Sequence, residues 1–193
     1  QSILVDQSFG SQNELLGKVA NTNVFPWLSL DEVIKSTERL GKLVGAEDKS
    51  AQLVNEYRSH LKPQISPDSP VTIMLLGAGS STVKDLWYIK PDSLHGAALA
   101  AAGFKNALPT GIQGPPSLSV EKFIAYDPEI VIVMAPTDTP DARGAIRASL
   151  EQITPLKAVQ NGQIHIISGE NIMGTGPGII DFAKQLKTLR KSL

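Results

Sequence analysis

The chain has 193 residues, of which 41% are hydrophobic and 19% charged, and its formal net charge is −1. This composition is typical of a chain that buries a core, so it excludes a disordered tail, and the balanced charge gives no basis for nucleic-acid binding. The absence of cysteine excludes disulfides, thiolate metal sites and cysteine nucleophiles. No apolar run approaches the roughly 18 residues of a membrane span. No signal peptide is visible at Gln1, so we expect that one has been removed or that the chain is a fragment.

Residues 1–28 predict a small β-α-β piece. Apolar residues indicate short strands at 2–6 and 24–28, with a helix at about 12–20 between them. The apolar side chains of this piece exceed what two short strands and one helix can bury. We therefore expect them to lie against the helices from Ser29 onward or against a second copy of the chain.

Two helices are predicted next. Ser29 and Glu32 form a capping box, in which the serine side chain caps the helix and the glutamate returns a hydrogen bond. Glycines near residue 45 loosen the end of this helix, and a second helix covers about 47–61. Prolines between 62 and 70 then indicate a linker.

From residue 71 onward, apolar strands alternate with helices. A strand that is apolar on both faces belongs inside a parallel sheet covered by helices. The alternation therefore predicts a Rossmann-like, three-layer α/β/α lobe with a mostly parallel sheet. The expected strands are 71–76, 130–134 and 164–167. The expected helices are 92–102, 119–127, about 142–152 and a last one from 179.

Three strand-end loops, 77–91, 135–141 and 169–177, should emerge at one edge of this sheet, where open α/β sheets bind ligands. The loop that begins at Gly77 is glycine-rich but does not match a dinucleotide fingerprint, so it is either a nucleotide loop or a flexible strand end. The glycine-rich loop at 174–178 precedes a helix, where it either binds an anion or only caps the helix.

Other candidate residues lie on the same loops. Trp87 and Tyr88 would form either a lid on a ligand or a packing flap, and Arg143 either meets an anionic ligand bidentately or is solvated. The three histidines follow no metal-ligand spacing. His95 is the histidine closest to the expected ligand edge. No nucleophile elbow or Walker loop is present, so the sequence carries no hydrolase or NTPase signature.

Residues 119–134, SVEKFIAYDPEIVIVM, combine a capped helix, a tight corner and a buried strand. This run resembles the periplasmic substrate-binding proteins of ABC importers for iron-siderophores, haem and vitamin B12. Further segments similar to that family occur in matching order. They are residues 30–57, 94–108, 154–167 and 176–181.

This resemblance implies a binding protein rather than an enzyme, with no cofactor. The ligand would be a metal chelate, namely a ferric siderophore, haem or cobalamin, and the partner an ABC permease in the membrane. The location would be periplasmic or extracellular, either free or held at the membrane as a lipoprotein. Residues 1–28 would be a remnant of an N-terminal lobe, 29–67 the connecting helices with a long interdomain helix, and 68–193 the C-terminal α/β lobe. A missing N-terminal lobe or a second copy would then complete the cleft.

The resemblance also implies site residues. The cleft-facing positions map onto Trp87, Tyr88, residues 113–116, Arg143, Asn171 and Met173. The docking glutamate of the family matches Glu121, which we expect to be exposed at a helix N-terminus and away from the strand-end edge. The alternative to this function is a cytoplasmic α/β nucleotide-binding or enzymatic domain that uses residues 77–81. A further alternative is an interaction domain with no small ligand.

Overall fold

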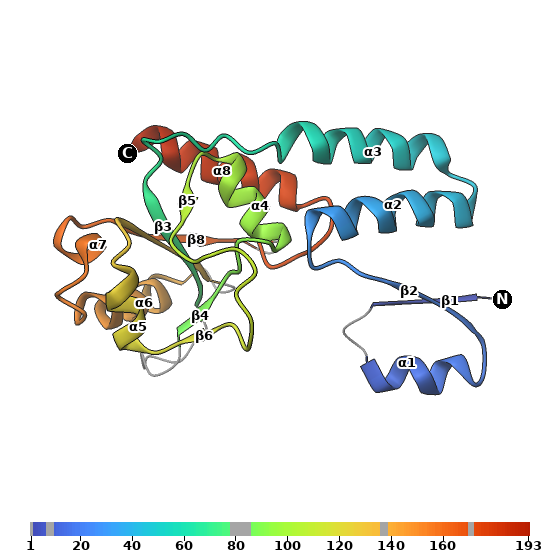
Figure 1. Cartoon of the computed structure of the whole chain (residues 1–193), viewed down its shortest axis with the longest axis horizontal. Coiled ribbons are helices and arrows are strands. Elements are labelled where there is room, and N and C mark those ends of the chain that lie inside the picture. The colour runs from blue at the N-terminus through green and yellow to red at the C-terminus, as the bar shows by residue number, and fades with distance from the viewer. Residues whose placement is uncertain (1, 7–9, 78–85, 136–138, 170–171) are drawn as a thin grey trace.

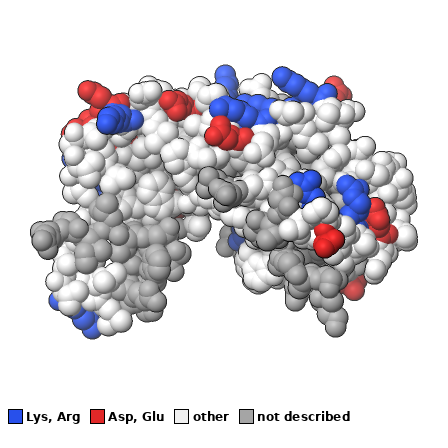
Figure 2. All heavy atoms as spheres, turned by 180° about the vertical axis from the view of Figure 1, so that it is seen from behind, with Lys and Arg blue, Asp and Glu red and all other residues white. Residues whose placement is uncertain are grey.

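The computed structural model describes residues 2–6, 10–77, 86–135, 139–169 and 172–193. In Figure 1, a larger α/β unit and a small N-terminal unit lie apart, and two antiparallel helices run between them. On the face that Figure 2 shows, acidic and basic side chains are interspersed. This distribution agrees with the balanced charge of the sequence.

The N-terminal unit consists of β1 (Ser2–Asp6), α1 (Gly10–Gly17) and β2 (Asn21–Phe25). The two strands pair in parallel, as a β-α-β connection requires. β2 begins and ends earlier than the sequence predicts, because Pro26 has no N–H to contribute to a ladder. Two strands and one helix form this unit within the described residues, so it is not an independently cored lobe.

The connecting helices are α2 (Leu30–Val44) and α3 (Glu47–His60). The predicted capping box is confirmed: the Glu32 N–H donates to Ser29 Oγ at 3.2 Å, and the Ser29 N–H donates to Glu32 Oε2 at 3.0 Å. Gly45 ends α2 in a left-handed conformation with φ of 68°. The two helices therefore form a hairpin of 15 and 14 residues.

The sheet of the α/β unit has the order β6-β4-β3-β7-β8, with β5 beside the start of β3. β5, β3, β7 and β8 are parallel, whereas β4 is antiparallel to both β3 and β6. The predicted mostly parallel α/β fold is thus confirmed. The strands are β3 (Val71–Leu76), β4 (Leu86–Tyr88), β5 (Lys105–Asn106), β6 (Ser117–Leu118), β7 (Ile130–Ala135) and β8 (Ile164–Ser168).

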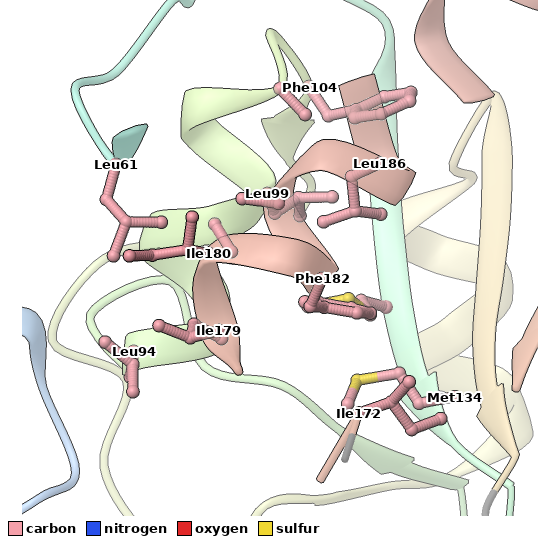
Figure 3. Packing of buried hydrophobic residues seen from close by; sticks show 14 of the residues in the cluster. Leu61, Leu94, Leu99, Phe104, Met134, Ile172, Ile179, Ile180, Phe182 and Leu186 are labelled. Atoms are coloured by element: carbon pink, nitrogen blue, oxygen red, sulfur yellow. The ribbon is translucent and has the colours of Figure 1, made fainter. Parts of the chain in front are cut away.

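Helices cover both faces of this sheet, as the three-layer prediction requires. β7 shows why: Ile132 and Met134 face one core, and Val131 and Val133 face the other. The first, which we call the α8-side core, includes residues of α4 and α8, and Figure 3 shows part of its packing. The second, the α5-side core, includes residues of α5, α6 and α7. The helices are α4 (Leu94–Ala101), α5 (Val120–Tyr126), α6 (Pro140–Glu151), α7 (Lys157–Gln160) and α8 (Ile179–Ser192).

The connecting helices pack directly on the α/β unit. Val33 of α2 and Tyr57 of α3 are buried in the α8-side core. Lys187 Nζ donates to the carbonyl of His60 at 2.9 Å, and the Leu94 N–H donates to the carbonyl of Leu28 at 2.7 Å. These contacts fix the hairpin and the segment that leads into it against α4 and α8.

Candidate functional site

The carboxyl ends of three parallel strands meet at one edge of the sheet, which we call the strand-end edge. β3 ends at Leu76, β7 at Ala135 and β8 at Ser168, and the Gly77 N–H donates to the carbonyl of Met134 at 2.8 Å. The predicted meeting of these strand ends is therefore confirmed. Much of the loops lies outside the described residues, and so does Asn171. The undescribed stretches at this edge are 78–85, 136–138 and 170–171.

Trp87 and Tyr88 lie on a strand, not on the loop that the sequence suggested. β4 forms because the side of β3 offers backbone partners: the Ile89 N–H donates to the carbonyl of Met74 at 2.8 Å. Alternation along β4 then separates the two aromatic residues. Trp87 is 43% exposed and pairs with Leu76 at the strand-end edge, whereas Tyr88 is 3% exposed within the α5-side core.

Arg143 lies over the carboxyl end of β8. Its Nη2 donates to Ser168 Oγ at 2.8 Å. The start of α6 places it there, because Thr139 caps the helix through a 3.2 Å bond from the Ala142 N–H. One turn further along, Arg147 Nη2 donates to the carbonyl of Ile164 at the opposite end of β8, at 2.8 Å. The guanidinium of Arg143 is thus exposed at the strand-end edge but oriented by a hydroxyl.

Met173 also lies near this edge, just after the carboxyl end of β8, and its side chain is 42% exposed. The preceding residue, Ile172, is buried at 3% exposure, and its carbonyl lies 2.7 Å from His95 Nε2. The His95 ring meets Phe182 edge-on, with centroids 5.5 Å apart. Burial lowers the pKa of His95, although the bond to Ile172 opposes this effect. Sequence reasoning missed this contact.

Glu121 is exposed in the first turn of α5, as expected. Its own backbone N–H and the Ser119 hydroxyl lower the pKa of its carboxyl group. The prediction that Glu121 lies away from the strand-end edge is wrong. Leu118 pairs with Leu86, one residue beyond the level of Leu76, so α5 begins at the same end of the sheet. A helix that leads into a parallel strand has to begin at that end.

Residues 113–116 and 174–178 are two further loop segments whose backbone groups have partners. The carbonyl of Gly114 accepts a hydrogen bond from Lys90 Nζ at 3.0 Å, which ties residues 113–116 to the segment after β4. At the start of α8, the N–H groups of Ile179 and Ile180 donate to carbonyls within the preceding turn, each at 3.1 Å. Because these two N–H groups are already bonded, they are not available to an anion.

A groove of about 460 Å³ lies at the opposite edge of the sheet. Glu129 and Lys157 line it, but both have partners: Glu129 Oε2 accepts from the Val71 N–H at 2.9 Å, and Lys157 Nζ lies 2.9 Å from Asp127 Oδ2. Across the described parts of the chain, no three histidine or acidic side chains are grouped to hold a metal ion. The candidate site is therefore the strand-end edge.

The fold has clear counterparts among solved structures. An ABC transporter substrate-binding protein from Listeria monocytogenes superposes with a TM-score of 0.79 at 14% identity, covering 97% of this chain and 75% of that one. A periplasmic haem binding protein from Pseudomonas aeruginosa gives 0.71 at 19% identity, covering 97% and 71%. The periplasmic vitamin B12 binding protein of Vibrio cholerae gives 0.71 at 16% identity, covering 98% and 73%. No curated protein matches the chain.

The family of the chain is shown by its sequence. The pattern of the periplasmic binding proteins matches residues 2–170, which is most of the chain. This family consists of substrate-binding proteins, so the nucleotide-binding or enzymatic alternative is not favoured, and membership implies a periplasmic or extracellular location. None of the helices in the described ranges is both long and apolar enough to cross a membrane. The chain belongs to the periplasmic binding protein family.

Proposed function

We propose that this chain is a solute-binding component of an ABC importer and that its ligand is a metal chelate, namely a ferric siderophore, haem or cobalamin. Proteins of the same fold include binders of haem, of vitamin B12 and of a catecholate siderophore. The observation that carries the proposal is that Trp87, Arg143 and Met173 all lie at one edge of a parallel sheet.

These three side chains suit a flat, anionic chelate. The exposed indole of Trp87 offers a face for stacking, and the thioether of Met173 adapts to an apolar surface. Arg143 supplies positive charge in a planar group that pairs with carboxylates, and Ser168 orients it. Tyr88 is buried and contributes packing instead. Asn171 keeps its proposed ligand role, although it lies outside the described residues.

The strand-end edge supplies one wall of a cleft. Good sites bury most of the ligand surface, so we propose that an N-terminal lobe or a second copy supplies the other wall. In this organisation residues 1–28 belong to the first lobe, 29–67 connect the lobes, and 68–193 form the second. Glu121 would dock a permease, and its place at the ligand end of the sheet supports a handover of ligand there. A lipid anchor would keep the protein near that permease.

Titration of a ferric siderophore, haem and cobalamin tests this proposal. The chain has two tryptophans, so a Trp27→Phe variant makes Trp87 the sole indole reporter. We expect weak binding by this chain and tight binding by a version with a complete first lobe. In the two-lobed protein, Arg143→Ala should weaken an anionic chelate by about tenfold, as the loss of a charged hydrogen bond implies. Arg58→Ala, at an exposed ion pair between α2 and α3, is the matched control and should leave affinity unchanged.

Two results would overturn parts of the proposal. If the two-lobed protein binds none of the three ligand classes, the metal-chelate assignment is wrong. If this chain alone binds as tightly as the two-lobed protein, the second wall is unnecessary. Glu121→Ala should leave every affinity unchanged while it lowers transport through the permease, and equal transport would remove the docking role.

A further inference from the structure

His95 is a buried, polar side chain that the proposed binding residues do not use. It is 8% exposed and lies in the first turn of α4, next to Leu94. Among the described residues, the ring bonds to the carbonyl of Ile172, which is 77 residues further along the chain and 2.7 Å from Nε2. Because a carbonyl only accepts, Nε2 has to carry the hydrogen. The ring therefore acts as a donor toward the loop that follows β8.

The main chain at Ile172 is held from two sides. Its side chain is in the α8-side core, beside Met134 in Figure 3, and its carbonyl is bonded to His95. The ring of His95 is itself fixed by its edge-on contact with Phe182, 5.5 Å away between centroids. Met173 comes next in the chain and is exposed at the strand-end edge. The direction in which Met173 leaves the loop thus depends on the bond at Ile172.

The residue before His95 makes a second long-range bond. The Leu94 N–H donates at 2.7 Å to the carbonyl of Leu28, which lies in the segment between β2 and α2. Two consecutive residues of α4 therefore hold two different parts of the molecule, the crossing segment and the loop that carries Met173. In each case a buried residue of α4 satisfies a backbone group of the other segment.

We propose that His95 is a positioning residue for ligand binding, which holds Ile172 so that Met173 is presented at the strand-end edge. This inference rests on the proposed function for the ligand, but the positioning of Met173 is a property of the protein without ligand. Burial lowers the pKa of His95, so the ring is neutral at neutral pH and presents a single N–H to the carbonyl.

The test compares two variants with opposite hydrogen-bonding capacity. His95→Phe keeps a ring beside Phe182 but has no donor, and His95→Gln restores an N–H near the position of Nε2. The chain has three methionines, so methyl-labelled methionine reports Met173 directly, with Met74 in the core as an internal reference. We expect His95→Phe to move the Met173 methyl signal toward the value of a free side chain and His95→Gln to keep it in place.

Backbone hydrogen exchange measures how much the loop after β8 loosens when the bond is lost. With the Ile172 carbonyl unpaired, exchange of the Ile172 N–H, which is bonded to the carbonyl of Gly169, should rise about tenfold in His95→Phe. It should stay within about twofold of the parent in His95→Gln, since a lost hydrogen bond is worth about one power of ten. Ligand affinity in the two-lobed protein should follow the same pattern. His165→Phe, at a half-buried histidine of β8, is the control and should change neither readout.

The outcomes separate this inference from the proposed function. An unchanged Met173 signal and unchanged exchange in His95→Phe would overturn the positioning role. A shifted signal with unchanged ligand affinity would overturn its relevance to binding. If no ligand class binds at all, the proposed function fails, and the methyl signal and exchange still decide whether His95 positions Met173. Should His95→Phe fail to fold, His95→Leu provides the same loss of donor in a smaller side chain.

Discussion

The two units of this chain contain similar kinds of apolar residues but bury them very differently. In the α/β unit, helices cover both faces of the sheet, and Phe123 and Phe182 are at most 1% exposed. In the N-terminal unit, Leu15 is 62% exposed, Val19 79% and Val24 37%. An isolated pair of strands is marginally stable in water. The comparison shows that the second layer over a sheet, rather than apolar content, decides which unit stabilises itself.

The N-terminal unit is instead held by its contacts with α2. Arg39 of α2 donates to the carbonyl of Val24 at 3.0 Å and to Asn23 Oδ1 at 2.9 Å, and its guanidinium lies 5.0 Å from the centre of the Phe25 ring. Ser36 Oγ adds a 2.7 Å bond to the carbonyl of Pro26. Phe25 is consequently buried at 2% exposure. The prediction that apolar side chains of residues 1–28 lie against the helices from Ser29 onward is confirmed at Phe25, while Leu15 and Val19 remain exposed.

The largest contrast is expected from truncating one apolar side chain in each unit. Phe123→Ala should cost about 3–5 kcal/mol of unfolding free energy, because it leaves a cavity in the α5-side core. Val19→Ala should change the unfolding free energy by less than about 0.5 kcal/mol, since the side chain is largely in water. Urea unfolding measures both. Comparable costs at the two positions would contradict the comparison.

A smaller effect is expected when the N-terminal unit is released from α2. Arg39→Ala removes two charge-assisted hydrogen bonds and a cation–π contact, so it should destabilise β2 by about 1–3 kcal/mol. Hydrogen exchange of residues 21–25 should rise, while exchange in β7 should remain as in the parent. Arg58→Ala serves as the control, because its pair with Glu38 is 3.4 Å long and exposed, and such pairs contribute little. Equal effects of both variants would show that Arg39 is not the attachment point.

The smallest expected effect is a pH dependence that belongs to the α/β unit. The folded pKa of His95 lies below its ordinary value of 6.5, because burial disfavours the charged ring. As pH falls below 6.5, the unfolded chain takes up this proton before the folded chain does, so stability declines until the folded pKa is passed. Burial and nearby Arg147 lower the pKa of His165 in the same direction. The free energy of unfolding should therefore depend less steeply on pH between 7 and 5 in His95→Gln than in the parent. An unchanged pH dependence would contradict this assignment.

Local patterns predicted those parts of the structure that local interactions determine. The capping box at Ser29 and the buried strands β3, β7 and β8 were found because a cap spans one turn and an apolar run marks an inner strand. The strands β4 and β6 were not found, since two or three residues carry too little pattern and form only where a partner strand lies alongside.

The candidate site also contains some features that the sequence could predict and others that it could not. The strand-end edge follows from topology, so it could be predicted once the sheet was recognised as parallel. The place of Glu121 also follows from topology, because α5 leads into β7, and that signal was present in the sequence. The burial of Tyr88 and the bond between His95 and Ile172 depend on packing between remote segments. No pattern along the chain indicates either of them.

The two arginines of α6 have a consequence beyond ligand binding. β8 is the last strand on its side of the described sheet, and such a strand exposes backbone groups that can recruit strands from other molecules. The Gln163 carbonyl accepts a hydrogen bond from β7. Because successive carbonyls of a strand point to opposite sides, the Ile164 carbonyl faces outward, where it accepts a hydrogen bond from Arg147. Arg143 covers the far end of the strand through Ser168. Two arginines one helical turn apart thus protect this edge, because charged side chains at an edge strand discourage pairing with strands of other molecules.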